Sequence, residues 1–274
     1  MTISRDTLFQ IFKYTVYVLL AMNVYWFFAL EHAAAKVQFP DGVAWQDLKV
    51  AYVAAIDTAA WVVLLLMFEL ETYVLDDKHF TKPVVWGLHG LRIVCYAFIV
   101  SAFIDYINSL VFVQSVTPLT GVDNLCALVS QQWSYAAGFD DYVAISTGNC
   151  ASLSPASAFV VFEETQAVVD LPGHAAIVRL GWVDVINSGV WLLVVMVLEI
   201  DVRLQEHNRY EGLALKVSNA LKGVLYSLLL CAAVYWGIEG DFVDFWDAFL
   251  WLVAFVFIEL NVFEWRQEEL QAQG

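Results

Sequence analysis

The chain has 274 residues, of which 61% are hydrophobic and only 15% are charged, and its mean hydropathy is +0.66. A soluble domain of this size does not carry so much apolar surface, so the composition indicates an integral membrane protein with the lipid bilayer as its first partner. The formal net charge of −16 argues against nucleic acid as a partner, because no basic stripe is present to neutralise phosphates.

Six apolar stretches are long enough to cross a hydrocarbon core, which takes about 20 residues of helix. They are residues 9–31, 50–72, 84–112, 180–202, 215–237 and 242–264. The stretches are too long and too evenly apolar for the alternating strands of a membrane barrel. We therefore predict an all-α integral membrane protein with six transmembrane helices and an insertion, residues 114–178, between the third and fourth.

The positions of Lys and Arg predict the orientation. If the N-terminus is cytoplasmic, ten of the thirteen basic residues lie at or near the inner side, as the positive-inside rule requires. Both termini are then cytoplasmic, the membrane is the inner one, and the insertion 114–178 faces outward. Cleavage of a signal peptide near Ala35 is an alternative. The apolar run from Tyr14 to Leu30 exceeds the usual core of about 7–15 residues, which favours retention.

The insertion 114–178 has the composition of a partly folded cap. It holds the only two cysteines outside the apolar stretches, Cys126 and Cys150, on the side of the membrane where disulfides persist. We predict a bridge between them; two free thiols are the alternative. Residues 157–169 are predicted to form a short helix along the membrane surface. The many acids of the insertion would raise the local cation concentration at an entrance, or serve solubility alone.

An internal repeat runs through the predicted helices. Three of them carry an acid or amide, then Trp four residues on, then Glu after eight more, and a further polar residue two positions later. The copies are Asp57-Trp61-Glu69-Glu71, Asn187-Trp191-Glu199-Asp201 and Asp247-Trp251-Glu259-Asn261. The helices that precede them share a base with Tyr four residues later: Lys13/Tyr17, Arg92/Tyr96 and Lys222/Tyr226. The pattern predicts three tandem helical hairpins, residues 9–72, 84–202 and 215–264, in a pseudo-threefold bundle.

The polar residues of each copy form one stripe along a helix, and in lipid such a stripe turns inward. At its cytoplasmic end, the acids that begin at Glu69, Glu199 and Glu259 lie level with Lys13, Arg92 and Lys222, so ion pairs are expected there. Purely structural pairing is the alternative to an ion gate. The deeper layer of Asp57, Asn187 and Asp247 has no base at its level within its own repeat, and intramembrane carboxylates are rare enough to suggest function.

These patterns predict a protein that binds or conducts a cation or proton along a polar axis. A membrane scaffold or subunit, which contacts itself or a partner protein through the outer cap, is the second interpretation. Nothing in the sequence has the spacing of a zinc or haem site, a nucleotide-binding glycine motif or a nucleophile elbow. We therefore expect no cofactor and no catalytic residue, and the identity of any bound metal ion is open.

Overall fold

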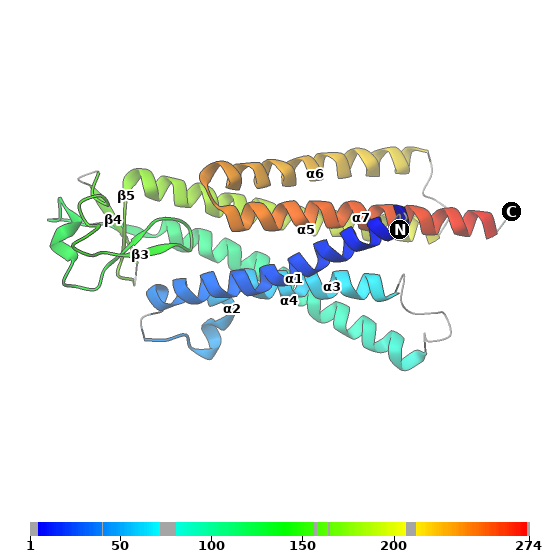
Figure 1. The fold of residues 1–274 in the computed structure, drawn as a ribbon, viewed down its shortest axis with the longest axis horizontal. Helices are drawn as coiled ribbons and strands as arrows, with labels where there is room; N and C mark the ends of the chain where they lie inside the picture. Colours follow the sequence, from blue (N-terminus) through cyan, green and yellow to red (C-terminus); the bar gives the residue numbers. More distant parts are fainter. Residues whose placement is uncertain are drawn as a thin grey trace. The chain divides into compact units, whose positions relative to one another are not determined.

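The computed structural model describes residues 5–39, 41–71, 81–155, 158–163, 165–206 and 212–272. Within these ranges, the side chains of residues 5, 6, 205, 206 and 258–272 are outside the description. The described chain is mostly helical (Figure 1). The long helices are α1 (Arg5–Gln38), α3 (Val53–Glu69), α4 (Lys82–Gln114), α5 (Leu171–Glu206), α6 (Leu213–Glu239) and α7 (Phe242–Ala272). Three shorter helices are η1 (Trp45–Asp47), α2 (Leu48–Ala51) and η4 (Leu125–Leu128).

Four helices are long and apolar enough to cross a membrane, as the composition predicts. They are Thr7–Gln38, Lys82–Gln114, Leu171–Leu204 and Leu213–Glu239. The segments Trp45–Ala51 and Val53–Glu69 meet at an angle of 75° and make a fifth if the bent pair is one span. The predicted sixth span, 242–264, falls in α7, whose side chains are described only as far as Phe257. The described residues thus give four to five candidate spans, and the sixth stays a prediction.

The chain forms two compact units. Unit 1 consists of residues 1–23 and 189–274, and so contains the first part of α1, the last part of α5, and all of α6 and α7. Unit 2 consists of residues 24–188 and contains the remaining elements.

In unit 1, α6 and α7 form a tight helical hairpin. Gly240 ends α6 in the left-handed conformation, with φ of 90°, which glycine adopts without a Cβ penalty. The next residue, Asp241, accepts a hydrogen bond from the backbone N–H of Asp244 and so caps the start of α7. Leu229 of α6 and Ala254 of α7 are almost fully buried, as is Val194 of α5. The apolar faces of these helices supply the core of unit 1.

Unit 2 carries a five-stranded sheet, which corrects the all-α prediction. Its strands are β1 (Val116–Pro118), β2 (Ser134–Ala136), β3 (Tyr142–Ala144), β4 (Phe159–Phe162) and β5 (Ala167–Asp170), in the order β1-β4-β5-β2-β3. β2 and β5 are parallel, and the other neighbours are antiparallel. The helix predicted over 157–169 is wrong: β4 and β5 occupy this segment as an antiparallel pair. β-Branched and aromatic residues dominate both strands, and these types pack well on a pleated surface.

The sheet has an apolar core on each of its faces, because successive residues of a strand point to opposite sides. Along β5, Ala167 and Val169 join one core, while Val168 joins the other. The first core also takes Leu110 from α4 and Ile177 from α5, so the sheet packs against the ends of these two helices. A strand that is buried on both faces lacks the polar alternation of a half-exposed strand. This explains why β5 could not be separated from a helix by periodicity.

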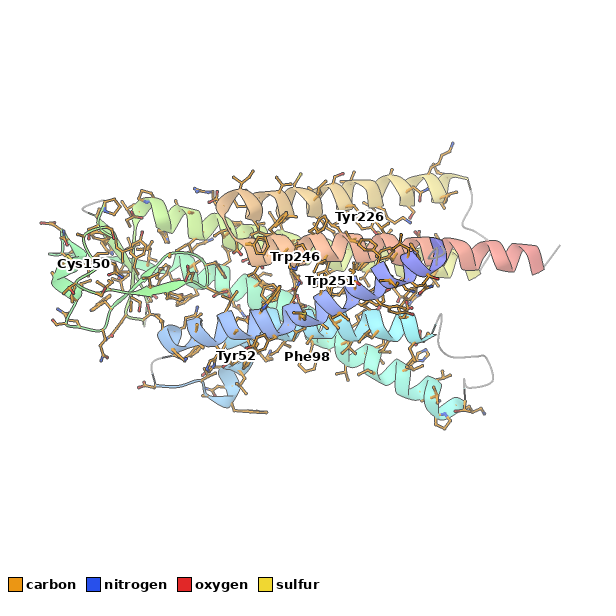
Figure 2. The ribbon with its side chains drawn as sticks, in the orientation of Figure 1. Tyr52, Phe98, Cys150, Tyr226, Trp246 and Trp251 are labelled. Atoms are coloured by element: carbon orange, nitrogen blue, oxygen red, sulfur yellow. A yellow bond between two sulfur atoms is a disulfide. The ribbon has the colours of Figure 1, made fainter. Side chains whose placement is uncertain are left out.

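The predicted disulfide is confirmed. Cys126 and Cys150 are bonded, with their Cα atoms 4.9 Å apart, and the bridge ties η4 to the segment that follows β3 (Figure 2). Cys150 is itself part of the second core, together with Leu125 and Leu128 of η4. The insertion is therefore a folded sheet domain with a covalent closure.

Candidate functional site

The predicted deep layer is divided between the two units. Asp57 lies on α3 and Asn187 on α5, both in unit 2, and Asp247 lies on α7 in unit 1. All three side chains are half-buried. A common axis for the three residues stays a prediction.

Asp247 has the best-defined surroundings of the three. The side-chain amide of Asn23 donates a hydrogen bond to Asp247 Oδ1, with an N···O distance of 2.7 Å. The indole of Trp251, one helical turn further along α7, donates to the same carboxylate. Residues four apart lie on one face of a helix, so this contact gives a physical reason for the Asp-Trp spacing in the third repeat copy. Both partners are neutral, and no described base makes an ion pair with Asp247.

The position of Asn23 places this contact at membrane depth. Asn23 is fully buried and lies near the middle of the candidate span Thr7–Gln38. At 1.5 Å per residue, the span is about 48 Å long and Asn23 is about 24 Å from its start. A hydrocarbon core of about 30 Å includes that point wherever it is placed along the helix. If α1 crosses the membrane, the carboxylate of Asp247 therefore lies within the hydrocarbon core.

Sequence reasoning missed Asn23. It lies outside the repeat pattern and is not ionisable, so neither the repeat nor the positions of the charged residues point to it. The signal available was its context, since a side chain with two donors and an acceptor in the middle of an apolar helix requires a polar partner. Its Oδ1 atom is buried and accepts no hydrogen bond from any described residue.

At the opposite end of unit 1, Asp201 of α5 lies in a buried polar cluster with α6. It accepts a hydrogen bond from the hydroxyl of Ser218 at 2.7 Å and pairs with Lys222 Nζ at 3.3 Å. The Asp201 side chain is 5% exposed and that of Lys222 is 14% exposed. Lys13 of α1 is also buried completely, with its Nζ atom 5.0 Å from the ring centroid of Tyr14. Charges this deep require partners, because the loss of hydration costs several kcal/mol per ion.

Unit 2 has a related ion pair between Glu71, two residues after the end of α3, and α4. Arg92 Nη2 lies 2.6 Å from Glu71 Oε2, and both side chains are partly exposed. These two ion pairs involve the second acid of a repeat tail, Glu71 or Asp201, and the closure expected at Glu69 and Glu199 stays a prediction. Glu69 is buried and Glu199 is half-buried. The side chains of Glu259 and Asn261 lie outside the described residues.

The repeated aromatic residues take different environments. Trp191 and Trp251 of unit 1 are buried against the same side chain, Phe255, with ring centroids 4.6 Å and 6.4 Å away. Trp61 is half-buried in unit 2. Of the repeated tyrosines, Tyr17 is buried, and Tyr96 and Tyr226 are half-buried.

A second carboxylate site lies at the break between α2 and α3. The chain leaves helical geometry at Tyr52, with φ of −135° and ψ of 39°, which frees the backbone N–H groups that begin α3. Glu31 of α1 accepts from two of them, Ala54 N at 2.6 Å and Ala55 N at 3.0 Å. The Glu31 side chain is 5% exposed. An acid at a helix N-terminus is favoured by the helix dipole, so the carboxylate stabilises the break from a different helix.

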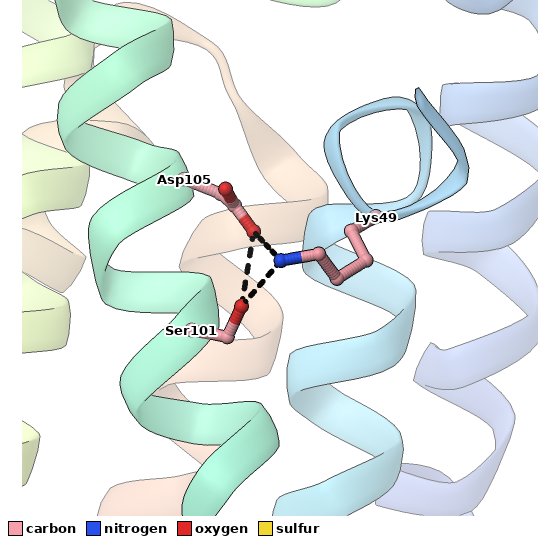
Figure 3. Close-up of polar contacts among 3 residues, drawn as sticks. All are labelled: Lys49, Ser101 and Asp105. Atoms are coloured by element: carbon pink, nitrogen blue, oxygen red, sulfur yellow. Dashed lines mark hydrogen bonds and ion pairs between the residues drawn. The ribbon is translucent and has the colours of Figure 1, made fainter. Parts of the chain in front are cut away.

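Two further contacts hold the same break. The rings of Phe28, His32 and Tyr52 stack, and His32 Nδ1 is 2.9 Å from the hydroxyl of Tyr52. On the α4 side, Lys49 Nζ lies 2.8 Å from the Ser101 hydroxyl and 3.7 Å from Asp105 Oδ2 (Figure 3). These contacts hold Tyr52 against α1 and Lys49 of α2 against α4.

Replacing Glu31 with Ala is expected to destabilise the protein by about 1–3 kcal/mol for each backbone donor left without a partner. Unfolding of purified protein in detergent by increasing SDS, followed by tryptophan fluorescence, measures the change. Glu163→Ala removes an exposed acid from unit 2 and serves as the control, with an expected change within about 0.5 kcal/mol. Equal stability of Glu31→Ala and wild type would show that the cap contributes nothing.

Among the described residues, no group of three or more His, Cys, Asp or Glu side chains is arranged to hold a metal ion. Comparison of the chain with protein-family models, with curated proteins and with solved structures finds no match.

Proposed function

We propose that this membrane protein binds and conducts a proton or another cation along a polar path that includes Asp247. The observation that carries the proposal is the environment of this carboxylate, which has two neutral hydrogen-bond donors at the depth of Asn23. A carboxylate at the centre of a membrane helix costs about 2.5–3.5 kcal/mol even on insertion scales. Uptake of a proton or a cation removes that cost, and a site that loads and unloads is the basis of transport.

In the full proposal, six helices form three hairpins around one axis, with Asp57, Asn187 and Asp247 along it. Two ion pairs support the repeat. Arg92 and Glu71 are separated by 21 residues, and so are Lys222 and Asp201. Each pair joins the base of one hairpin to the last acid of the preceding hairpin. By the same rule, the third pairing would join Lys13, the base of the first hairpin, to Asn261, the last polar residue of the third repeat copy. We place the inner closure of the path at these pairs and at Glu69, Glu199 and Glu259.

We further propose that both termini are cytoplasmic, that the membrane is the inner one and that the sheet domain lies outside. In intact cells, Cys126 and Cys150 should then react with an impermeant alkylating reagent only after reduction of their disulfide. A cysteine introduced by Glu269→Cys should stay unlabelled until the cells are opened. Labelling of residue 269 in sealed cells would overturn this orientation.

The direct test of transport is flux into proteoliposomes that contain the purified protein, measured against empty vesicles. Protons, monovalent cations and divalent cations are each tested under an imposed gradient. We expect flux above the empty vesicles for at least one of them.

A scaffold function is the second candidate, and the sheet domain favours it. Strands β1 and β3 are the edges of the sheet in the described chain, and an edge strand can pair with a strand of another protein. A homo-oligomer or a membrane-protein partner bound through this domain would then be the functional unit. Absence of flux for every cation, together with a stoichiometric partner that is lost when the sheet domain is removed, would replace the transport proposal with this one.

A further inference from the structure

We infer that the site formed by Asn23, Asp247 and Trp251 takes a proton and not a metal cation. This inference rests on the proposed function and narrows its substrate class.

The ligands present fit a proton. Hard metal cations require several oxygen ligands, six or more for Mg²⁺ and Ca²⁺. The described partners of Asp247 are two N–H groups, which donate hydrogen bonds and cannot ligate a metal. Asn23 Oδ1 is the one further oxygen in these side chains. A proton needs a single acceptor, which the carboxylate itself supplies.

Asn23 can satisfy both states of the carboxylate. When Asp247 is charged, Nδ2 of Asn23 donates to it, as observed. When Asp247 is protonated, its O–H becomes a donor and requires an acceptor. Rotation of the Asn23 amide by half a turn presents Oδ1, which is buried and accepts from no described residue in the observed state. The same side chain is thus a donor to the anion and an acceptor from the acid, which makes it the positioning residue of the site.

The neighbouring titratable groups leave Asp247 without a fixed counter-charge. Apart from Asp201 and Lys222, the titratable side chains described on the elements of unit 1 are Lys13, Tyr14 and Tyr17 of α1, Glu199 and Arg203 of α5, Lys216, Tyr226, Cys231, Tyr235 and Glu239 of α6, Asp241 before α7 and Asp244 of α7. Asp201 and Lys222 pair with each other. None of these groups makes a hydrogen bond or ion pair with Asp247 in the described structure. A permanent ion pair would hold the carboxylate charged, whereas neutral donors leave it able to exchange its proton.

The test is infrared spectroscopy of the full-length protein in lipid, titrated with acid and base. A protonated carboxyl group has its own C=O stretching band, and the difference between wild type and Asp247→Asn isolates the band of Asp247. We expect one band that appears and disappears reversibly with pH, at a midpoint that is the same in sodium, potassium, magnesium and choline chloride. If a cation competes for the site, the midpoint falls by about one pH unit for each tenfold rise in its concentration. Such a shift would overturn the inference.

Further variants separate a specific site from a general change in the protein. Asn23→Leu should displace the midpoint, because the amide that contacts both charge states is lost. Asn108→Leu replaces an exposed asparagine of α4 and should leave the midpoint in place. Equal effects of the two variants would contradict the role of Asn23.

If Asp247→Asn fails to fold, Trp251→Phe replaces it as the perturbing variant, with a displaced midpoint as the expected result. Reversible titration of Asp247 without any flux would contradict the proposed function but would still support a proton site at Asp247.

Discussion

The double substitution of Asp57 and Asp247 with Asn is expected to abolish cation or proton flux in proteoliposomes, to the level of empty vesicles, while the protein stays folded. An amide has nearly the shape of the carboxylate but cannot take up a proton or neutralise a cation. Asn187 occupies the corresponding position of the second repeat copy, so the sequence already contains an amide in this layer. Initial rates of flux under an imposed gradient measure the effect.

The control for this experiment is Asp123→Asn, which removes an exposed acid of the sheet domain. It lowers the negative charge of that domain without touching the proposed path, so flux should change little. Size-exclusion profiles and tryptophan fluorescence establish that each variant is folded. Undiminished flux in the double variant would show that the path lies elsewhere in the protein.

Breaking the pair of Asp201 with Lys222 is expected to have the largest effect on stability, about 3–5 kcal/mol for either Asp201→Asn or Lys222→Met. Each substitution removes this partner from a buried charge, since both side chains are at most 14% exposed. Unfolding by SDS, followed by tryptophan fluorescence, measures the loss. The variant that carries both substitutions should recover a large part of it, because neither charge of the pair then remains.

Lys49→Met supplies the matched comparison. Lys49 also pairs with an acid on a neighbouring helix, but its side chain is 54% exposed, and exposed pairs contribute about 0–1 kcal/mol. If Lys222→Met lowers the free energy of unfolding no more than Lys49→Met does, the pair of Asp201 with Lys222 is hydrated in the membrane.

Part of the fold was predictable because the relevant signal is local. A helix that crosses a bilayer satisfies all its backbone groups within one segment, so an apolar run of sufficient length predicts the candidate spans directly. The disulfide followed in the same way from two cysteines outside those runs. The strands were missed because β4 and β5 are short and apolar, and only contacts between distant segments decide whether such a run pairs as a sheet.

The break at Tyr52 and the site of Asn23 could not be predicted for a related reason. No Gly or Pro occurs between Trp45 and Glu69, so nothing in the segment marks the end of a helix. The break depends on Glu31, which lies on a different helix. Likewise, the spacing of Asp247 and Trp251 within one helix was visible in the sequence, whereas the partner from α1 is more than 200 positions away.

Within unit 2, helix α1 carries both Phe28 and Glu31, and each of these side chains has a partner at the break: Phe28 stacks on Tyr52, and Glu31 accepts from Ala54 and Ala55. The two side chains are three positions apart, which corresponds to about 4.5 Å along the helix and about 60° around its axis. A residue inserted between them would turn one side chain by about 100° relative to the other. The two contacts then could not form together on a straight helix. Between these positions, evolution is free to exchange side chains but not to change the length of the chain.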